Sequence, residues 1–187
     1  MARIEDLAKV YERHIKLPWQ RTVAGAQRII MLVYEKEAER ALRARLKNFE
    51  IATAEAGKAW RTVDITDSFA AWMAGEEYRD AYFEMPEDLQ LKLDAEFAGF
   101  VADRIRSALT DPAVDEDTVV AVIGAGSLFG FTRLSRVLTL VEPDIRGRLL
   151  VFFPGQYEDN TYRLLDARDG WNYLAVPITL HGGGAQS

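Results

Sequence analysis

The sequence predicts an α/β fold: a single-domain, three-layer sandwich with a mostly parallel, Rossmann-like sheet of about five strands and helices on both faces. The first indication is the segment 117–140, in which an apolar, β-branched run at 119–123 precedes a glycine-rich turn and an amphipathic helix. A short apolar run bounded by turn residues is typical of a strand buried on both faces. The second indication is that strand-like and helix-like segments alternate along the chain, as they do in parallel sheets with crossover helices.

The front of the chain supplies an extra helix and then the first strand. Apolar residues recur at helical spacing from residue 4 to residue 16, and Pro18 ends that helix in an extended link. Residues 28–34 form a strand candidate, and residues 36–57 follow as a helix that ends at Gly57.

The middle of the chain continues with a second strand over residues 60–66, after which Asp67 is placed as the N-cap of a short helix. Pro86 then begins a long helix at its permitted first-turn position. Its expected buried stripe comprises Leu89, Leu93, Phe97, Phe100, Val101, Ile105 and Leu109. The central strand and its helix come next, and the buried face of that helix is expected to comprise Leu134, Val137, Leu138 and Val141.

The last third of the chain is expected to add two strands, at residues 148–153 and 171–179. Pro177 favours an edge position for the second of these. Between them, residues 157–170 form a polar excursion that we judge too long for a tight hairpin. Residues 1–180 are therefore expected to form one domain, followed by a flexible, glycine-rich tail at 181–187.

The composition argues against several classes of function. The formal net charge of −6 argues against broad nucleic-acid binding, although a local basic patch stays open. The chain has no cysteine, which excludes disulfides, zinc–thiolate sites and cysteine nucleophiles. It has neither a signal-peptide pattern nor an apolar run near the ~20 residues that span a bilayer, so we expect no membrane association and a cytoplasmic location.

The default place for a ligand is the edge of the sheet where the parallel strands end. Four segments are expected to meet there: residues 34–35, 66–67, 124–130 and 154–157. Carboxylates at this edge could hold a divalent cation, but in a chain with 29 acidic residues chance clustering explains them as well, and we assign no metal site. The carboxylates in question are Glu35, Asp64, Asp67, Glu158 and Asp159.

The glycine loop is the candidate ligand site, comprising Gly124, Gly126, Ser127, Gly130 and Arg133. It lacks the Gly-Lys-Ser/Thr of a P-loop, and its glycine spacing misses the dinucleotide fingerprint by one residue. The competing interpretation is that the glycines permit a tight turn and close helix packing. We therefore assign no cofactor.

Ser127 is the one candidate nucleophile of the loop, but it lies outside a G-x-S-x-G context. The only histidines, His14 and His181, belong to the first helix and the tail. We therefore expect Ser127 to cap a helix, and we assign no catalytic residue.

Aromatic residues outside the expected core stripes offer a different role. Many of them are expected to pack beneath long loops, and the remainder could form a contact surface, because Trp, Tyr and Arg dominate interface energetics. Our candidate partner-binding residues are Phe129, Tyr157, Tyr162 and Arg163.

Several segments resemble the BrxB family of BREX (bacteriophage exclusion) phage-defence systems. They are LPWQR (17–21), LVYEKEAERALRARL (32–46), VDITDSFAAWMA (63–74), GSLFGFTRLS (126–135) and the long block at 145–178. The resemblance implies a small cytoplasmic component of a multi-protein system that methylates host DNA and blocks phage replication. It implies no catalytic residues. It implies association with other BREX proteins, most directly with PglZ, a phosphatase-like protein.

Two hypotheses follow. The first is a non-enzymatic adaptor of a BREX-type system, and a homodimer is compatible with its spare aromatic surface. The alternative is an α/β domain that binds a nucleotide, phosphate or metal at the Gly124–Gly130 loop, with or without catalysis. Direct DNA binding is a third hypothesis that the net charge disfavours.

Overall fold

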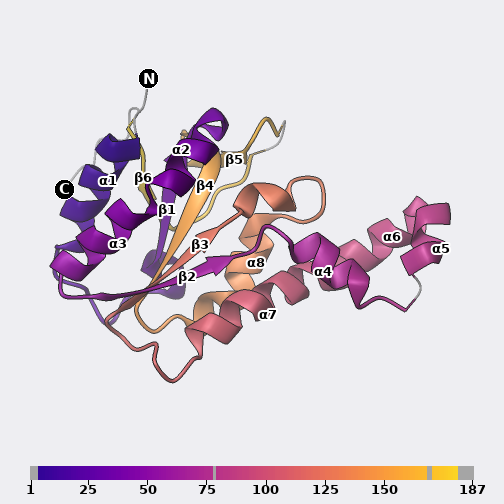
Figure 1. Cartoon of the computed structure of the whole chain (residues 1–187), viewed down its shortest axis with the longest axis horizontal. Helices are drawn as coiled ribbons and strands as arrows, with labels where there is room; N and C mark the ends of the chain where they lie inside the picture. Colours follow the sequence, from indigo (N-terminus) through magenta and orange to yellow (C-terminus); the bar gives the residue numbers. More distant parts are fainter. Residues whose placement is uncertain (1–3, 78, 168–169, 181–187) are drawn as a thin grey trace.

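The computed structural model describes residues 4–77, 79–167 and 170–180, and a six-stranded sheet lies at its centre (Figure 1). The strands are β1 (Ile29–Tyr34), β2 (Ala59–Asp64), β3 (Thr118–Ile123), β4 (Arg148–Glu158), β5 (Thr161–Leu164) and β6 (Val176–Ile178). Their order is β2-β3-β4-β1-β6, every neighbouring pair in it is parallel, and β5 joins β4 in antiparallel fashion. The predicted mostly parallel sheet is confirmed.

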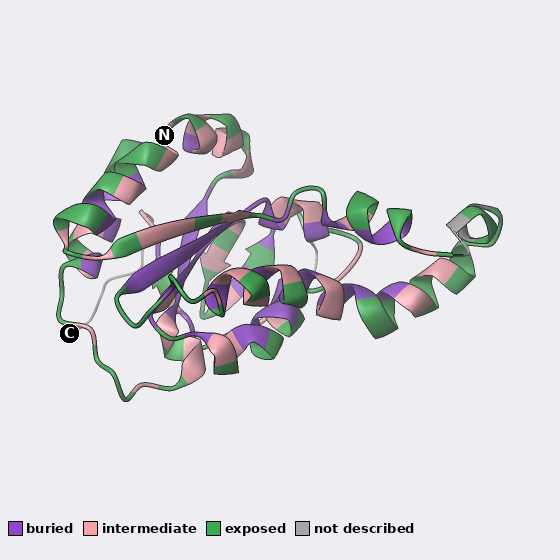
Figure 2. Ribbon diagram, turned by 60° about the horizontal axis from the view of Figure 1, so that its bottom comes forward, coloured by how far each residue is buried: buried purple, intermediate pink, exposed green. Residues whose placement is uncertain are grey.

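Helices cover both faces of the sheet, which makes the predicted three-layer sandwich (Figure 1). One face is covered by α1 (Ile4–Ile15), α2 (Glu39–Ala44) and α3 (Leu46–Glu55), and the other by α4 (Ser68–Ala74), α7 (Ala98–Leu109) and α8 (Leu134–Val141). The helices α5 (Arg79–Glu84) and α6 (Pro86–Lys92) extend away from the sheet as an arm. Figure 2 shows that the surface of this arm is largely exposed.

The apolar run at 119–123, from which we predicted a buried strand, lies in strand β3. All six of its residues are buried. Val119 and Ala121 face the core beneath α1 and α3, whereas Val120 and Val122 face the core beneath α7 and α8. Because successive side chains of a strand point to opposite faces, a strand between two helical layers must be apolar throughout.

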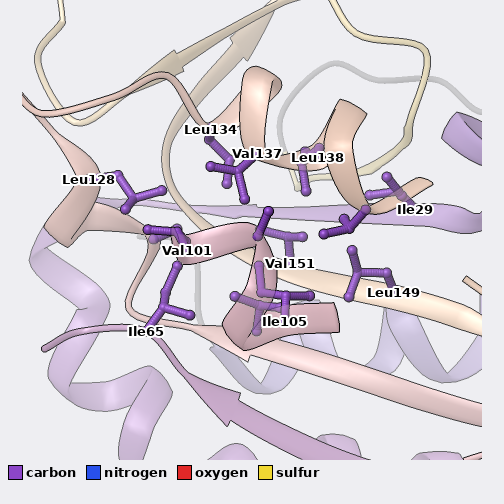
Figure 3. Packing of buried hydrophobic residues seen from close by; sticks show 14 of the residues in the cluster. Ile29, Ile65, Val101, Ile105, Leu128, Leu134, Val137, Leu138, Leu149 and Val151 are labelled. Carbon is purple, nitrogen blue, oxygen red and sulfur yellow. The ribbon is translucent and has the colours of Figure 1, made fainter. Parts of the chain in front are cut away.

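The helices also bury the residues that their spacing predicts. The four apolar residues expected on α8 are all buried, and Figure 3 shows side chains of α7 and α8 meeting those of β1 and β4. Along the predicted stripe of the long helix, Leu89 and Phe100 are only partly buried. That helix contains a π-helical turn, Leu93–Phe97, between α6 and α7.

The polar excursion is the main error in the predicted fold. Strand β4 continues past Pro154 to Glu158, and the chain returns at once as β5. The turn is Asp159-Asn160, with φ of 50° and 62°, and positive φ at both positions is the feature of the tight type I′ hairpin turn. The judgement that this segment is too long for a tight hairpin is therefore wrong, and β5 is the sixth strand.

Three smaller expectations also change. The helix predicted over 36–57 is divided into a 3-10 turn, α2 and α3, although Gly57 does end it, with φ of 75°. Asp67 makes no capping hydrogen bond and instead pairs with Arg104 at 2.8 Å. The last strand is only three residues long, and Pro177 lies in it at the sheet edge, as predicted. The tail at 181–187 lies outside the described residues.

Candidate partner-binding surface at the glycine loop

The four segments predicted to meet at the carboxyl ends of the strands do lie at one edge of the sheet. Gly124 lies against Thr66, and Gly126 lies against Pro154. The end of β1 is connected to the end of β2 by side chains. The Tyr34 hydroxyl donates to Glu39, which in turn accepts a hydrogen bond of 2.8 Å from Arg43.

Arg43 extends this network across the edge. Its guanidinium donates to Thr66 Oγ1 at 2.8 Å and lies 3.4 Å from Asp64 Oδ2. Burial acts to raise the pKa of Asp64, but hydrogen bonds from Thr66 and the charge of Arg43 outweigh it and lower this pKa. Asp64 is therefore a charged residue satisfied by its neighbours. Over residues 4–77, 79–167 and 170–180, no group of three His, Cys, Asp or Glu side chains could hold a metal ion.

The glycine loop is built as a turn. Gly124 adopts φ of +90°, and Ala125–Leu128 forms a single 3-10 turn. The Ser127 hydroxyl donates to the Gly124 carbonyl at 2.7 Å. Helix α8 begins only at Leu134, after Arg133, so Ser127 does not cap it as we expected. Ser127 instead closes the turn that leads out of β3.

The two phenylalanines of the loop have different environments. Phe131 stacks on Phe69 of α4, with ring centroids 4.2 Å apart and planes 13° apart, and its edge meets Phe97 at 6.1 Å. Phe129 is 47% exposed. The loop is thus anchored by one aromatic ring and presents another to solvent.

Grooves lie beside this exposed part of the loop, residues 129–133. One, of about 290 Å³, is lined by Phe129, Arg133 and Trp171, among others. A second, of about 330 Å³, is lined by Phe131, Arg133 and Asp94, among others. Because Arg133 lines both, the loop 129–133 places an exposed aromatic ring and a guanidinium next to two concave surfaces.

The other predicted partner-binding residues lie on the β4–β5 hairpin, and they differ in exposure. Tyr162 is 0% exposed and packs against Tyr157, with ring centroids 4.5 Å apart, so its assignment to the surface is wrong. Arg163 is exposed because alternate residues of β5 point to opposite sides. Tyr157 is partly buried, and its hydroxyl lies 3.1 Å from Asn160 Oδ1.

Two further residues near the hairpin were not among our selected partner-binding candidates. Trp171 lines the first groove and pairs with Tyr162 through backbone hydrogen bonds of 2.8 and 2.9 Å. Leu174, close by in sequence, is 82% exposed. We did not select them because we expected a regular strand at 171–179, and a regular strand would have buried every second residue.

This fold and surface define a small α/β protein that presents an exposed aromatic loop, Phe129 to Arg133, near the carboxyl edge of its sheet. Comparison with known proteins is more specific. The family model described as "BREX protein BrxB" matches residues 62–178, from β2 to the end of β6. The chain belongs to this family and is a component of a BREX phage-defence system. No curated protein and no solved structure matches it.

Among the described residues, no helix is both long enough and apolar enough to cross a membrane.

Proposed function

We propose that this protein is a non-enzymatic adaptor of its BREX system, needed for assembly or activity of the methylation and restriction complex. It would act by binding other BREX proteins, most directly the PglZ-type phosphatase-like component, in the cytoplasm. Family membership supports the setting. The network at the carboxyl edge supports a role without catalysis, because Asp64, Thr66 and Arg43 already satisfy one another.

The single observation that carries the proposal is the loop 129–133. Phe129 is exposed although it is large and apolar. Aromatic residues, Phe included, and arginine are enriched at protein–protein interfaces relative to the rest of a protein surface. The ring is held in place because Phe131, two residues later, is packed between α4 and the π-helical turn.

The test is co-purification of the tagged chain with the PglZ-type protein and the remaining BREX components. We expect Phe129→Asp to abolish co-purification, since burying an unpaired carboxylate in an interface is costly. Ile51→Asp is the matched control. Ile51 is 46% exposed on α3, on the opposite face of the sheet, and its substitution should leave binding intact.

Two results would contradict the adaptor role. One is a wild-type chain that co-purifies with no BREX component. The other is a deletion strain that keeps both DNA methylation and phage exclusion. Light scattering on the purified chain tests the homodimer separately. If two copies associate through Phe129, the wild-type protein should have the mass of a dimer and the Phe129→Asp variant that of a monomer.

The alternative, a nucleotide, phosphate or metal bound at the Gly124–Gly130 loop, is favoured by one observation: Arg133 is exposed and lines both grooves. Thermal unfolding with nucleotides and divalent ions tests it. A ligand at 100 times its Kd stabilises the native state by about 2.7 kcal/mol. A shift of this size that Arg133→Ala removes would support the alternative over the adaptor role.

A further inference from the structure

The edge of the sheet opposite the glycine loop carries a pocket of about 430 Å³. Its lining residues lie at the entrances to four parallel strands. Arg28 precedes β1, Lys58 precedes β2, Asp117 precedes β3 and Arg146 precedes β4. Parallel strands bring their amino ends to the same edge, so residues more than 100 positions apart meet here. Trp19, in the link after α1, is also part of the pocket lining.

This pocket is basic in a chain with a net charge of −6. Five cations and two carboxylates line it, which leaves a formal excess of three positive charges. They are Arg21, Arg28, Lys58, Arg146, Arg148, Glu116 and Asp117. One of the carboxylates is already engaged, because Lys58 donates to Asp117 at 2.7 Å.

The guanidinium groups are held by neutral acceptors. Arg28 donates to the carbonyl oxygens of Ile145 and Arg21 at 2.7 and 2.8 Å. Arg146 and Arg148 donate to main-chain carbonyls of other segments at 2.7 and 3.1 Å. In the part of the chain that the structure describes, none of these three arginines has a carboxylate oxygen within 4.0 Å. The carbonyls fix the guanidinium groups but do not cancel their charge.

The clustered positive charges also affect the hydrogen bonding and the pKa values of groups in and beside the pocket. Arg28 Nε is buried and has no hydrogen-bond acceptor. Burial, and then the charge of Arg28, lower the pKa of Arg148. The pKa of His14 on α1 is lowered by burial and by the charge of Arg148. An anion in the pocket would relieve the repulsion between these groups.

Trp19 holds two of the cations together. Lys58 Nζ lies 4.3 Å from the centroid of its indole ring, and Arg148 Cζ lies 4.9 Å from it. The indole N–H is also used, since it donates to the Ile15 carbonyl at 3.1 Å. With its ring engaged by cations, Trp19 organises positive charge and is not placed as a platform for stacking a base.

We propose that this pocket is a binding site for a phosphate group. Phosphate carries up to two negative charges and three or more acceptor oxygens, and arginine forks match that geometry better than any other side chain. The pocket would recognise only the phosphate group of its ligand, whether that phosphate belongs to a nucleic-acid strand or to a small phosphorylated molecule. This site is separate from the loop 129–133 and does not depend on the adaptor role.

The experiment uses the full chain at low ionic strength with two probes. Calorimetry with inorganic pyrophosphate represents the small phosphate. Fluorescence anisotropy with a short labelled oligonucleotide, with and without a 5′-phosphate, represents the nucleic acid. Binding of pyrophosphate alone supports the site with a small-molecule source, and binding of the oligonucleotide as well supports a nucleic-acid source. Binding of neither probe overturns the proposal.

Charge-reversal variants locate the binding. Arg21→Glu is the first variant, because Arg21 is an exposed residue of the pocket lining, and, after Lys58, its charge also lowers the pKa of Asp117 across the pocket. Arg146→Glu is the second. Each should weaken binding about tenfold or more, as expected for a lost charge-assisted hydrogen bond. Arg40→Glu is the matched control, since it makes the same charge change on an exposed face of α2.

Unchanged melting temperatures would show that the variants fold. Equal loss of affinity in Arg40→Glu would overturn the proposal, because the effect would then reflect net charge only. So would binding that survives both pocket variants. An acidic peptide that binds more tightly than pyrophosphate would replace the phosphate with a partner carboxylate, and would likewise overturn it.

Discussion

Gly124 shows how a single residue shapes the candidate surface. It has φ of +90°, and a Cβ there would lie 2.3 Å from Thr66 Oγ1 and 2.7 Å from Thr66 N. The loop can therefore leave β3 beside β2 only if this position has no side chain. Gly99, in contrast, lies within α7, where a Cβ would meet nothing within 4 Å.

These two glycines give a paired prediction. Gly124→Ala should destabilise the fold by about 3 kcal/mol or more, because it combines backbone strain with overlap against main-chain atoms. Gly99→Ala should stabilise it by about 0.5–1 kcal/mol through helix propensity. Urea denaturation of both variants measures the two effects. A Gly124→Ala protein as stable as the wild type would contradict the close approach of β2 and the loop.

The sequence predicts a tight turn at these glycines but does not distinguish among them. Gly130 has φ of +82° and open space around it, whereas a Cβ on Gly126 would sit 3.4 Å from Pro154. The distinction depends on what lies beside each residue, and those neighbours, Thr66 just after β2 and Pro154 in β4, are far away in the chain. Glycine spacing alone cannot contain that information.

At the scale of elements, a buried pair of hydroxyls joins α1 to α3. Tyr11 and Thr53 are both 0% exposed, and their oxygens lie 2.6 Å apart. Thr53 Oγ1 also donates to the Phe49 carbonyl at 2.8 Å. Because threonine has one hydroxyl proton, Tyr11 must be the donor in the contact between the helices.

The direction of this hydrogen bond predicts unequal costs. Thr53→Val leaves the Tyr11 hydroxyl buried without an acceptor and should cost about 1–3 kcal/mol. Tyr11→Phe leaves Thr53 satisfied by Phe49 and should cost about 0.5–1.5 kcal/mol. The double variant removes both polar groups, so it should cost less than the sum of the two single changes. Strict additivity in denaturant titrations would contradict a direct hydrogen bond.

The β4–β5 hairpin shows why one element escaped sequence reasoning. Polar residues at 157–170 led us to expect an irregular excursion, yet the turn residues Asp159 and Asn160 are among those that accept positive φ most readily. Tyr157 and Tyr162 face each other in the register of the hairpin. Two tyrosines placed symmetrically about the Asp159-Asn160 turn, with four residues between them, were the available signal for a hairpin, and the polarity of the segment obscured it.

For the whole molecule, the fold class followed from the sequence because strands and helices alternate and β3 is apolar throughout. The strand order did not, since β1 lies between β4 and β6 and local patterns do not encode neighbours. The basic pocket was also missed. Its residues are single cations ahead of separate strands, and only the common direction of those strands brings them together.

The distribution of burial over the molecule makes a prediction about its dynamics. Strand β3 is buried on both faces between the two cores, whereas α6 has no buried residue and lies on the extended arm (Figure 2). Amides with few buried contacts exchange through local opening, and amides of the central sheet exchange only through global unfolding.

Hydrogen exchange followed by mass spectrometry should therefore separate the two elements. Amides of β3 should report the free energy of global unfolding, about 5–15 kcal/mol for a domain of ordinary stability. Amides of α6 should open at a small fraction of that free energy. Helix α7 continues from α6 through the π-helical turn, and its amides should resemble those of β3, because Val101, Ala102 and Ile105 are all 0% exposed. Protection of α6 equal to that of β3 would mean that the isolated chain covers its arm, for example by self-association through α6, and that the arm is not free to open in solution.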